Sequence, residues 1–284
     1  MSDFSHWATA LMSPSPFALV VAVLIALLLP VFLHTFFFHA SGLITLPSFL
    51  VVGPSGSGKT SLLTLFERGT AASTHTSQTS IAVECSLPID MRAESDKFRS
   101  VNDPNNRVHK KFLLVDTPGH GKLRYHALDQ IMKPQNLKGI IFLVDAAVLS
   151  AGDDGLRQTA DYLHDILLLL QKRLDGGKSS KALKNVPVLI AANKMDLFMA
   201  LPATLIKSNI ENEIVKVRNS RSKGLLDSGI SMGDSEEDDW VGEMGSKEFR
   251  FTQMEEFNIS VDVIGGSVLG ADASEWYKWI AGRL

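Results

Sequence analysis

The stretch GPSGSGKT, from Gly53 to Thr60, has the residue types and spacing of a phosphate-binding loop. Its glycines let the backbone curl so that successive N–H groups face a phosphate at the start of a helix. There Lys59 would bridge the β- and γ-phosphates of a nucleotide, which is a catalytic role in phosphoryl transfer, and the Thr60 hydroxyl would ligate Mg²⁺. We expect the nucleotide to contact Gly53, Ser55, Gly56, Ser57, Gly58, Lys59, Thr60 and Ser61.

A second element, DTPGH from Asp116 to His120, follows the apolar run KFLLV. An acid at the end of a buried strand can hold Mg²⁺ through water, so Asp116 joins Thr60 as a predicted metal ligand. The Gly119 N–H can reach a γ-phosphate. The DxxG string is common, and its weight here comes from its position at the end of a strand that follows a phosphate loop.

A third element, NKMD from Asn193 to Asp196, ends the apolar run VPVLIAA. The Asp196 carboxylate can accept hydrogen bonds from both N1–H and N2–H of guanine, and adenine has no donors at those positions. Asn193 would tie this loop to the phosphate loop, and the stem of Lys194 would cover the base. The order of the three elements therefore predicts a site for a guanine nucleotide, GTP or GDP, with Mg²⁺.

Apolar runs that alternate with amphipathic segments predict the elements that carry these loops. Nearly continuous apolar strands separated by helices indicate an α/β fold with a doubly wound, mostly parallel sheet, of the P-loop NTPase type. The predicted strands are Ser48–Val52, Ser80–Ile89, Lys111–Asp116, Gly139–Asp145, Val186–Ala192 and Phe257–Ile264. The predicted helices are Lys59–Arg68, Leu123–Lys133, Arg157–Leu174, Pro202–Arg218 and Ser274–Leu284.

An uncharged apolar run precedes the phosphate loop. Residues 17–39 contain no Asp, Glu, Lys or Arg, and as a helix they would extend ~33 Å, enough for the hydrocarbon core of a bilayer. A cleaved signal peptide and a buried core helix are the alternatives, but residues 1–16 lack the basic residues of a signal peptide. We expect one transmembrane helix, a short lumenal segment before it, and a nucleotide-binding domain over 45–284.

Composition limits the other classes of function. The 284-residue chain has a formal net charge of −3, so no overall basic field favours sequence-specific binding to nucleic acid. Its single cysteine excludes an internal disulfide and suits a reducing compartment. Residues 219–248 are rich in acids, Gly and Ser, which indicates an exposed, disordered loop. The alternative is that this acidic stretch binds a partner.

In this order the three motifs resemble those of Ras-like GTPases, over about Ser48–Leu284. The anchor, the strings SQTSI, DTPGHGKLR and LVDAA, and a last helix with Trp276 and Trp279 narrow the resemblance to β subunits of the signal recognition particle receptor. We expect the two tryptophans to pack the last helix on the sheet.

This resemblance implies a single-pass protein of the endoplasmic reticulum membrane with its GTPase domain in the cytosol. In the GTP state its switch segments would hold the N-terminal domain of the receptor α subunit for co-translational targeting, with the ribosome or translocon as open further partners. Two alternatives remain at this stage: an Arf-like membrane GTPase of vesicle traffic, and a nucleotide-dependent scaffold with negligible hydrolysis.

The resemblance also implies roles for single residues. Thr79, in SQTSI, matches the switch threonine that completes Mg²⁺ coordination in the GTP state. His120 stands where related GTPases position the attacking water, and a partner contact is the alternative role. Ser260-Val261 is the expected equivalent of the last guanine-contacting motif. No arginine that could neutralise the developing charge is evident, so we expect slow hydrolysis without a partner.

Overall fold

A computed structural model of the chain describes residues 16, 20, 23–30, 46–88, 91, 93, 110–134, 136–175, 186–227, 240–242 and 246–284. The chain divides into two units, Met1–Thr45 and Leu46–Leu284. Within the described residues, no helix combines the length and the apolar character needed to cross a membrane. Most of the predicted anchor, 17–39, lies outside those residues. Residues 23–30 are helical, with exposed side chains at Val23, Leu24, Ile25, Leu27, Leu28 and Leu29.

The second unit contains a six-stranded sheet in the order β2-β3-β1-β4-β5-β6. All neighbouring strands are parallel except β2 and β3, which are antiparallel. The predicted α/β fold with a mostly parallel sheet is thus confirmed. The strands are β1 (Ser48–Val52), β2 (Ile81–Ser86), β3 (Lys111–Asp116), β4 (Leu137–Asp145), β5 (Val188–Asn193) and β6 (Val261–Gly265).

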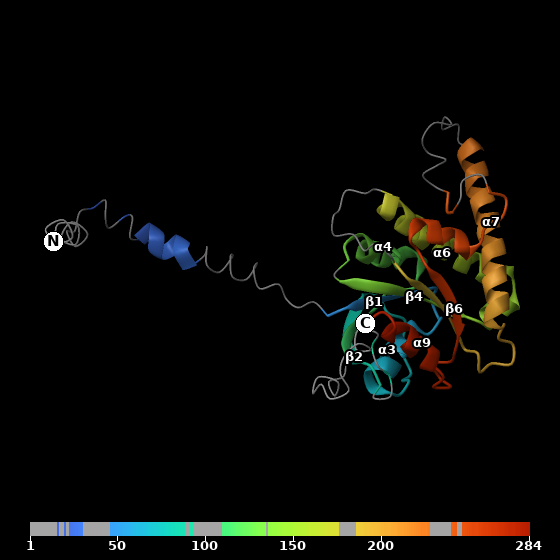
Figure 1. Cartoon of the computed structure of the whole chain (residues 1–284), viewed down its shortest axis with the longest axis horizontal. Coiled ribbons are helices and arrows are strands. Elements are labelled where there is room, and N and C mark those ends of the chain that lie inside the picture. The colour runs from blue at the N-terminus through green and yellow to red at the C-terminus, as the bar shows by residue number, and fades with distance from the viewer. Residues whose placement is uncertain are drawn as a thin grey trace. The chain divides into compact units, whose positions relative to one another are not determined.

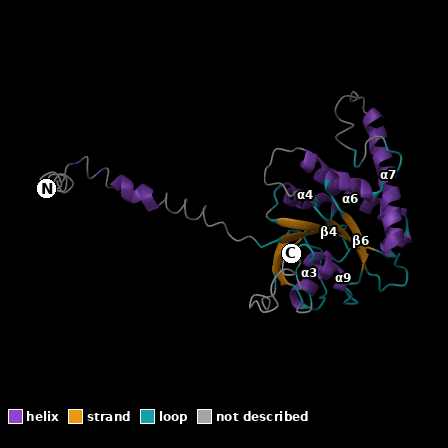
Figure 2. Ribbon diagram, viewed as in Figure 1, coloured by secondary structure: helices purple, strands orange, loops and turns teal. Residues whose placement is uncertain are grey.

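Helices cover both faces of this sheet (Figures 1 and 2). One face packs on α4 (Tyr125–Met132), α6 (Asp153–Asp175) and α7 (Ala203–Asp227), and the other on α3 (Lys59–Arg68) and α9 (Ser274–Ala281). Two 3₁₀ helices, η3 (Gly121–Leu123) and η4 (Phe251–Phe257), and the short α5 (Val148–Ala151) connect these elements. The apolar side chains of β1, β4 and β5 are therefore buried against one helical layer or the other, as the continuous apolar runs predict.

The last helix is fixed to the sheet by its tryptophans. Trp276 and Trp279 are 1% and 6% exposed and belong to the core on the α3 side of the sheet. The indole N–H of Trp276 donates to the Ile264 carbonyl oxygen (3.2 Å), and that of Trp279 donates to the Asp262 carboxylate (2.8 Å). The expectation that they pack this helix on the sheet is confirmed.

The structure differs from expectation near the acidic stretch. The helix predicted to end at Arg218 continues to Asp227, so the first part of the expected loop 219–248 is helical. Val241 is fully buried, so the stretch is not exposed throughout. Residues 228–239 and 243–245 lie outside the described part of the chain.

Arg218 holds part of that stretch against α7. Its buried guanidinium lies over the Trp240 ring, 4.0 Å from the ring centroid, and donates to the carbonyl oxygens of Val241 (3.2 Å) and Ser246 (2.5 Å). Composition alone does not reveal this anchor, because it does not show which distant side chain contacts the stretch.

Candidate functional site

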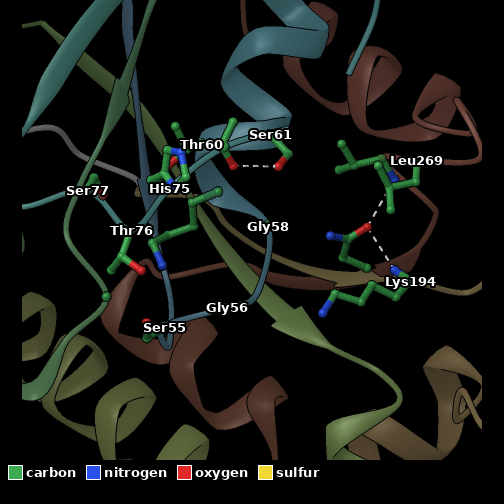
Figure 3. Close-up of a pocket in the computed structure, with 15 residues that line it drawn as sticks. Ser55, Gly56, Gly58, Thr60, Ser61, His75, Thr76, Ser77, Lys194 and Leu269 are labelled. Atoms are coloured by element: carbon green, nitrogen blue, oxygen red, sulfur yellow. Dashed lines mark hydrogen bonds between the residues drawn. The ribbon is translucent and has the colours of Figure 1, made fainter. Parts of the chain in front are cut away.

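The carboxyl ends of the central strands border a cavity of about 270 Å³. Ligands of doubly wound α/β folds bind at this edge, because loops from several strands converge there. The residues around the cavity are shown in Figure 3. The lining residues are Ser55, Gly56, Gly58, Lys59, Thr60, Ser61, Thr74, His75, Thr76, Ser77, Gly119, Asn193, Lys194, Val268 and Leu269.

The phosphate loop joins β1 to α3 and depends on two closely packed glycines. Gly53 has φ +143°, and a Cβ there would lie 2.2 Å from the Leu143 carbonyl oxygen. Gly58 has φ +98°, and its Cβ would lie 2.5 Å from the Asn193 side-chain nitrogen. The loop can therefore lie on β4 and beside Asn193 only because both positions lack a side chain.

Lys59 is the cation of this loop. Its side chain is buried, and its Nζ donates to the Pro54 carbonyl oxygen over 2.8 Å. Burial lowers the pKa of Lys59 to about 8, although the nearby Asp116 charge opposes this shift. A buried ammonium with this arrangement gains an anionic partner when a phosphate enters the cavity.

Thr60 and Asp116 form the candidate magnesium site. The Thr60 hydroxyl donates to Asp116 Oδ2 over 2.7 Å, whereas Asp116 Oδ1 is buried and has no hydrogen-bond partner. Burial raises the pKa of Asp116, and the hydrogen bond from Thr60 and the charge of Lys59 oppose the rise. Among the described residues no group of three or more His, Cys, Asp or Glu side chains gathers to hold a metal. The orphaned oxygen and the hydroxyls fit Mg²⁺, which takes few protein ligands beside phosphate oxygens and water.

Asn193 connects the loop after β5 to two other loops. Its side-chain amide donates to the Ser57 carbonyl oxygen (2.8 Å), and its Oδ1 accepts from the backbone N–H groups of Lys194 (2.8 Å) and Val268 (3.0 Å). The two bonds to Oδ1 are drawn in Figure 3. One side chain thus joins the NKMD loop to the phosphate loop, the link expected of Asn193, and also to the loop after β6, a link that the motifs do not predict.

Asp196 is held from the loop after β6. The Ser267 hydroxyl donates to Asp196 Oδ1 over 2.5 Å, and the same hydroxyl oxygen accepts from the Gly270 N–H over 2.8 Å. This contact orients the carboxylate that we predict to read the base. The Lys194 ammonium forms an ion pair with Asp145, at the end of β4.

Similarity to known proteins agrees with this geometry. Residues 45–258 match the protein family described as signal recognition particle receptor beta subunit. The chain belongs to this family. The family identification made from the motifs is thereby confirmed, and it favours a receptor β subunit over an Arf-like GTPase of vesicle traffic.

Relatives cover most of the chain. The signal recognition particle receptor subunit beta of Saccharomyces cerevisiae is 32% identical over 241 residues, 84% of each protein. The human subunit is 31% identical over 275 residues, which cover 94% of this chain and 86% of the human protein. At about this identity, residues must be compared one by one before any role is transferred.

Solved structures of the family carry the ligands that the motifs predict. The complex of SRb-GTP with SRX from Chaetomium thermophilum has 40% identity and a TM-score of 0.69, covering 84% of this chain and all of that chain. An SRb-GDP-Mg structure from the same organism has 43% identity and a TM-score of 0.61, covering 84% of this chain and 98% of that one. These structures support the expected guanine nucleotide and Mg²⁺.

In this family member, the predicted guanine-contacting pair Ser260-Val261 is wrong. Ser260 precedes β6, Val261 begins it, and neither lines the cavity. They lie at the amino end of the strand, whereas the nucleotide loops gather at the carboxyl ends. Beyond the carboxyl end of β6, Ser267 bonds to Asp196, and Val268 and Leu269 line the cavity. These residues lie where the sequence interpretation expected Ser260-Val261.

Six other predicted site residues also lie outside the cavity lining: Gly53, Ser57, Thr79, Asp116, His120 and Asp196. Thr79 is exposed, whereas Ser77 in the preceding part of the same segment lines the cavity. His120 is exposed, and its Nδ1 accepts from the Lys122 N–H over 3.3 Å. Gly119 does line the cavity, and a Cβ there would lie 2.4 Å from Lys59 Nζ. The roles proposed for Thr79 and His120 remain predictions.

Proposed function

We propose that this chain is the GTP-binding, membrane-anchored subunit of a signal recognition particle receptor. It binds GTP and GDP with Mg²⁺, and in its GTP state it holds the receptor α subunit at the endoplasmic reticulum membrane for co-translational targeting. Family membership supports this function, as does the solved complex of a related SRb-GTP with SRX.

The three hydrogen bonds of Asn193 are the observation that carries the nucleotide proposal. They bring a phosphate loop, a base-reading carboxylate loop and the loop after β6 to one cavity. Lys59 supplies the buried positive charge for the phosphates, and Asp196 supplies the acceptor that selects guanine. Thr60 and Asp116 would hold Mg²⁺, which neutralises charge on the β- and γ-phosphates when bound.

Membrane anchoring is proposed from the apolar run. Residues 17–39 carry no charged side chain, and residues 23–30 are helical with their large apolar side chains exposed. Such a helix is stabilised when the hydrocarbon core of a bilayer covers its apolar side chains. Because GTP is a cytosolic ligand, we place the nucleotide-binding unit in the cytosol and the N-terminus in the lumen.

Partner binding is proposed to depend on the γ-phosphate. The segment Thr74–Ser77 lines the cavity opposite Lys59 and Thr60, so this segment would respond to phosphate and Mg²⁺. The residues after Asp116 form the second responsive segment. An α subunit that contacts both segments would bind the GTP state in preference to the GDP state.

Hydrolysis is proposed to be slow in the isolated chain. The residues that line the described cavity include no arginine to neutralise the transition state, and His120 is exposed outside the lining. In a single-turnover assay with purified protein, we expect hydrolysis to accelerate only when a partner is added. Rapid hydrolysis by the chain alone would contradict this proposal.

Two measurements test the main function. Purified full-length protein in detergent should bind GTP and GDP with Mg²⁺, and excess ATP should not displace them. Affinity purification from solubilised membranes should recover a receptor α subunit with a non-hydrolysable GTP analogue and much less of it with GDP. Equal displacement by ATP, or recovery that ignores the nucleotide, would contradict the proposal.

A further inference from the structure

Asp145 is a carboxylate beside the base loop to which the motifs assign no role. It ends β4 and lies opposite Asn193 in the parallel register of β4 and β5. Its Oδ1 accepts from the backbone N–H groups of Ala147 (3.0 Å) and Val148 (3.2 Å), and its Oδ2 accepts from the Lys194 ammonium. The backbone therefore fixes the orientation of the carboxylate, and one oxygen remains for the lysine.

The backbone of Lys194, the other partner of this ion pair, is also fixed. Lys194 has φ +66°, a left-handed conformation that is uncommon for residues with a side chain, and its N–H donates to Asn193 Oδ1. Its backbone is thus held by the same amide that joins the three loops. Its flexible stem is then restrained at the far end by Asp145.

The restrained stem borders the cavity together with a second apolar wall. Lys194 and Leu269 both line the cavity and are labelled in Figure 3. The Asn193 amide joins their two loops by accepting from the N–H groups of Lys194 and Val268. Leu269 is 73% exposed, a high value for a large apolar side chain. A flat purine between the Lys194 stem and Leu269 would cover apolar surface of both.

We infer that Asp145 is a positioning residue for the nucleotide, acting through Lys194. By holding the ammonium, it keeps the lysine stem against one face of the guanine base, so it lengthens the residence time of GDP and GTP alike. The inference rests on the proposed function, because it assumes that a guanine nucleotide occupies this cavity.

The energetic basis is the low entropy cost of this particular pair. An ion pair between two free surface side chains gains little, because ordering both chains offsets the attraction. Here Asp145 is ordered by two backbone donors, and its side chain is 12% exposed against 30% for Lys194. Loss of the pair would release the lysine stem and open the base subsite to solvent.

The substitution D145N separates this role from a structural one. Asparagine keeps Oδ1 for the Ala147 and Val148 N–H groups, but its amide nitrogen cannot accept from the lysine. In full-length protein loaded with a fluorescent GDP analogue, we expect dissociation about three- to tenfold faster than wild type. The GTP analogue should change by the same factor. Preference over ATP and the unfolding temperature of nucleotide-free protein should not change.

A double-mutant cycle with K194M provides the decisive comparison. Methionine keeps an apolar stem without the charge, so D145N should have no further effect on dissociation in the K194M background. Acceleration by D145N that is equal in both backgrounds would overturn the inference, and so would a wild-type rate for D145N. The control D129N removes an exposed partner of Lys133 on α4 and should leave dissociation unchanged. Failure of wild-type protein to bind GDP would instead refute the proposed function, and the inference with it.

Discussion

The side chain of Asn193 donates a hydrogen bond to the carbonyl oxygen of Ser57 over 2.8 Å, across 136 positions of sequence. Asn193 is buried, and its side-chain oxygen accepts two further hydrogen bonds, from the backbone N–H groups of Lys194 and Val268. No water can replace these partners in a buried position without a cavity to hold it. Hydrogen bonds between protein groups alone therefore join the nucleotide loops.

We expect N193A to weaken GDP binding by about a hundredfold. The substitution leaves the Ser57 carbonyl and the N–H groups of Lys194 and Val268 without their partner, and each unsatisfied buried group costs about 1–3 kcal/mol. Titration with a fluorescent GDP analogue measures the loss. N212A, at an exposed position of α7, is the matched control. Equal affinities for the two variants would contradict the role of Asn193.

D196N should change the base that the site prefers. An asparagine amide at this position can donate to the C2 carbonyl oxygen of xanthine but cannot accept from both donors of guanine. Competition binding should show weaker GDP and stronger xanthosine diphosphate binding than wild type. An unchanged order of the two nucleotides would show that another residue reads the base. D129N, on the exposed face of α4, serves as the control.

The pH dependence of GDP binding should report Lys59. Burial lowers its pKa from 10.5 to about 8. Between these values the unfolded chain binds more protons, so the nucleotide-free protein gains stability as pH rises from about 8. A bound phosphate raises the pKa again, so GDP binding should take up a proton and weaken above pH ~8.

Calorimetry at pH 8.5 in buffers of different ionisation enthalpy measures this proton uptake. K59M should abolish the uptake and weaken GDP binding, without destabilising the nucleotide-free protein. K133M, at the exposed lysine that follows α4, should behave as wild type. Uptake that persists in K59M would assign the proton to another group.

Two glycines of positive φ should differ strongly in their tolerance of alanine. G53A places a Cβ 2.2 Å from the Leu143 carbonyl oxygen, so β1 or β4 must shift. We expect the free energy of unfolding to fall by more than ~3 kcal/mol. Gly69 has φ +75° with no atom within 4 Å of a Cβ, so G69A should cost only about 1 kcal/mol. Denaturant unfolding of nucleotide-free protein compares them, and equal losses would contradict the packing argument.

R218A should release the chain around Trp240 and Val241 from α7. Its loss leaves the carbonyl oxygens of Val241 and Ser246 without a donor and removes the cation from the Trp240 ring. We expect a loss of about 3 kcal/mol in unfolding free energy and faster proteolysis near Trp240, with GDP dissociation unchanged. R68A, at an exposed arginine of α3, is the control. Wild-type protection of Trp240 would contradict this anchor.

The sequence predicts the parts of the fold whose pattern is strong. The bounds of β1, α3 and β3 agree with the expected ranges residue for residue. In these elements a continuous apolar run, or a phosphate loop that leads into a helix, leaves few alternatives. The expected strand Phe257–Ile264 is displaced because Phe257 belongs to η4, where Phe251 and Met254 are buried. A short apolar run does not distinguish a strand from a helical turn.

The sequence predicts the site best at the residues that belong to a multi-residue motif. Lys59, Thr60, Asp116 and Asn193 occupy the expected positions, since each motif follows a recognisable strand. The short string Ser260-Val261 does not predict the guanine loop, because it stands at the amino end of β6. The signal that identifies Ser267 is positional: Gly265 ends β6, and ligand-binding residues follow the carboxyl ends of strands. Asp145 was missed because its role depends on the register of two strands.

Side chains along β5 point alternately to the two faces of the sheet, so the number of residues in β5 matters more than their identity. Leu189 and Ala191 face the α3 side and Ile190 and Ala192 face the other, so Asn193 continues the α3 side, where Ser57 lies. Exchange among small and branched apolar residues would preserve this direction. Insertion or deletion of a single residue would turn the amide toward the opposite layer. The residues of β5 can therefore exchange among small and branched apolar types, whereas a change in their number would break the link between the nucleotide loops.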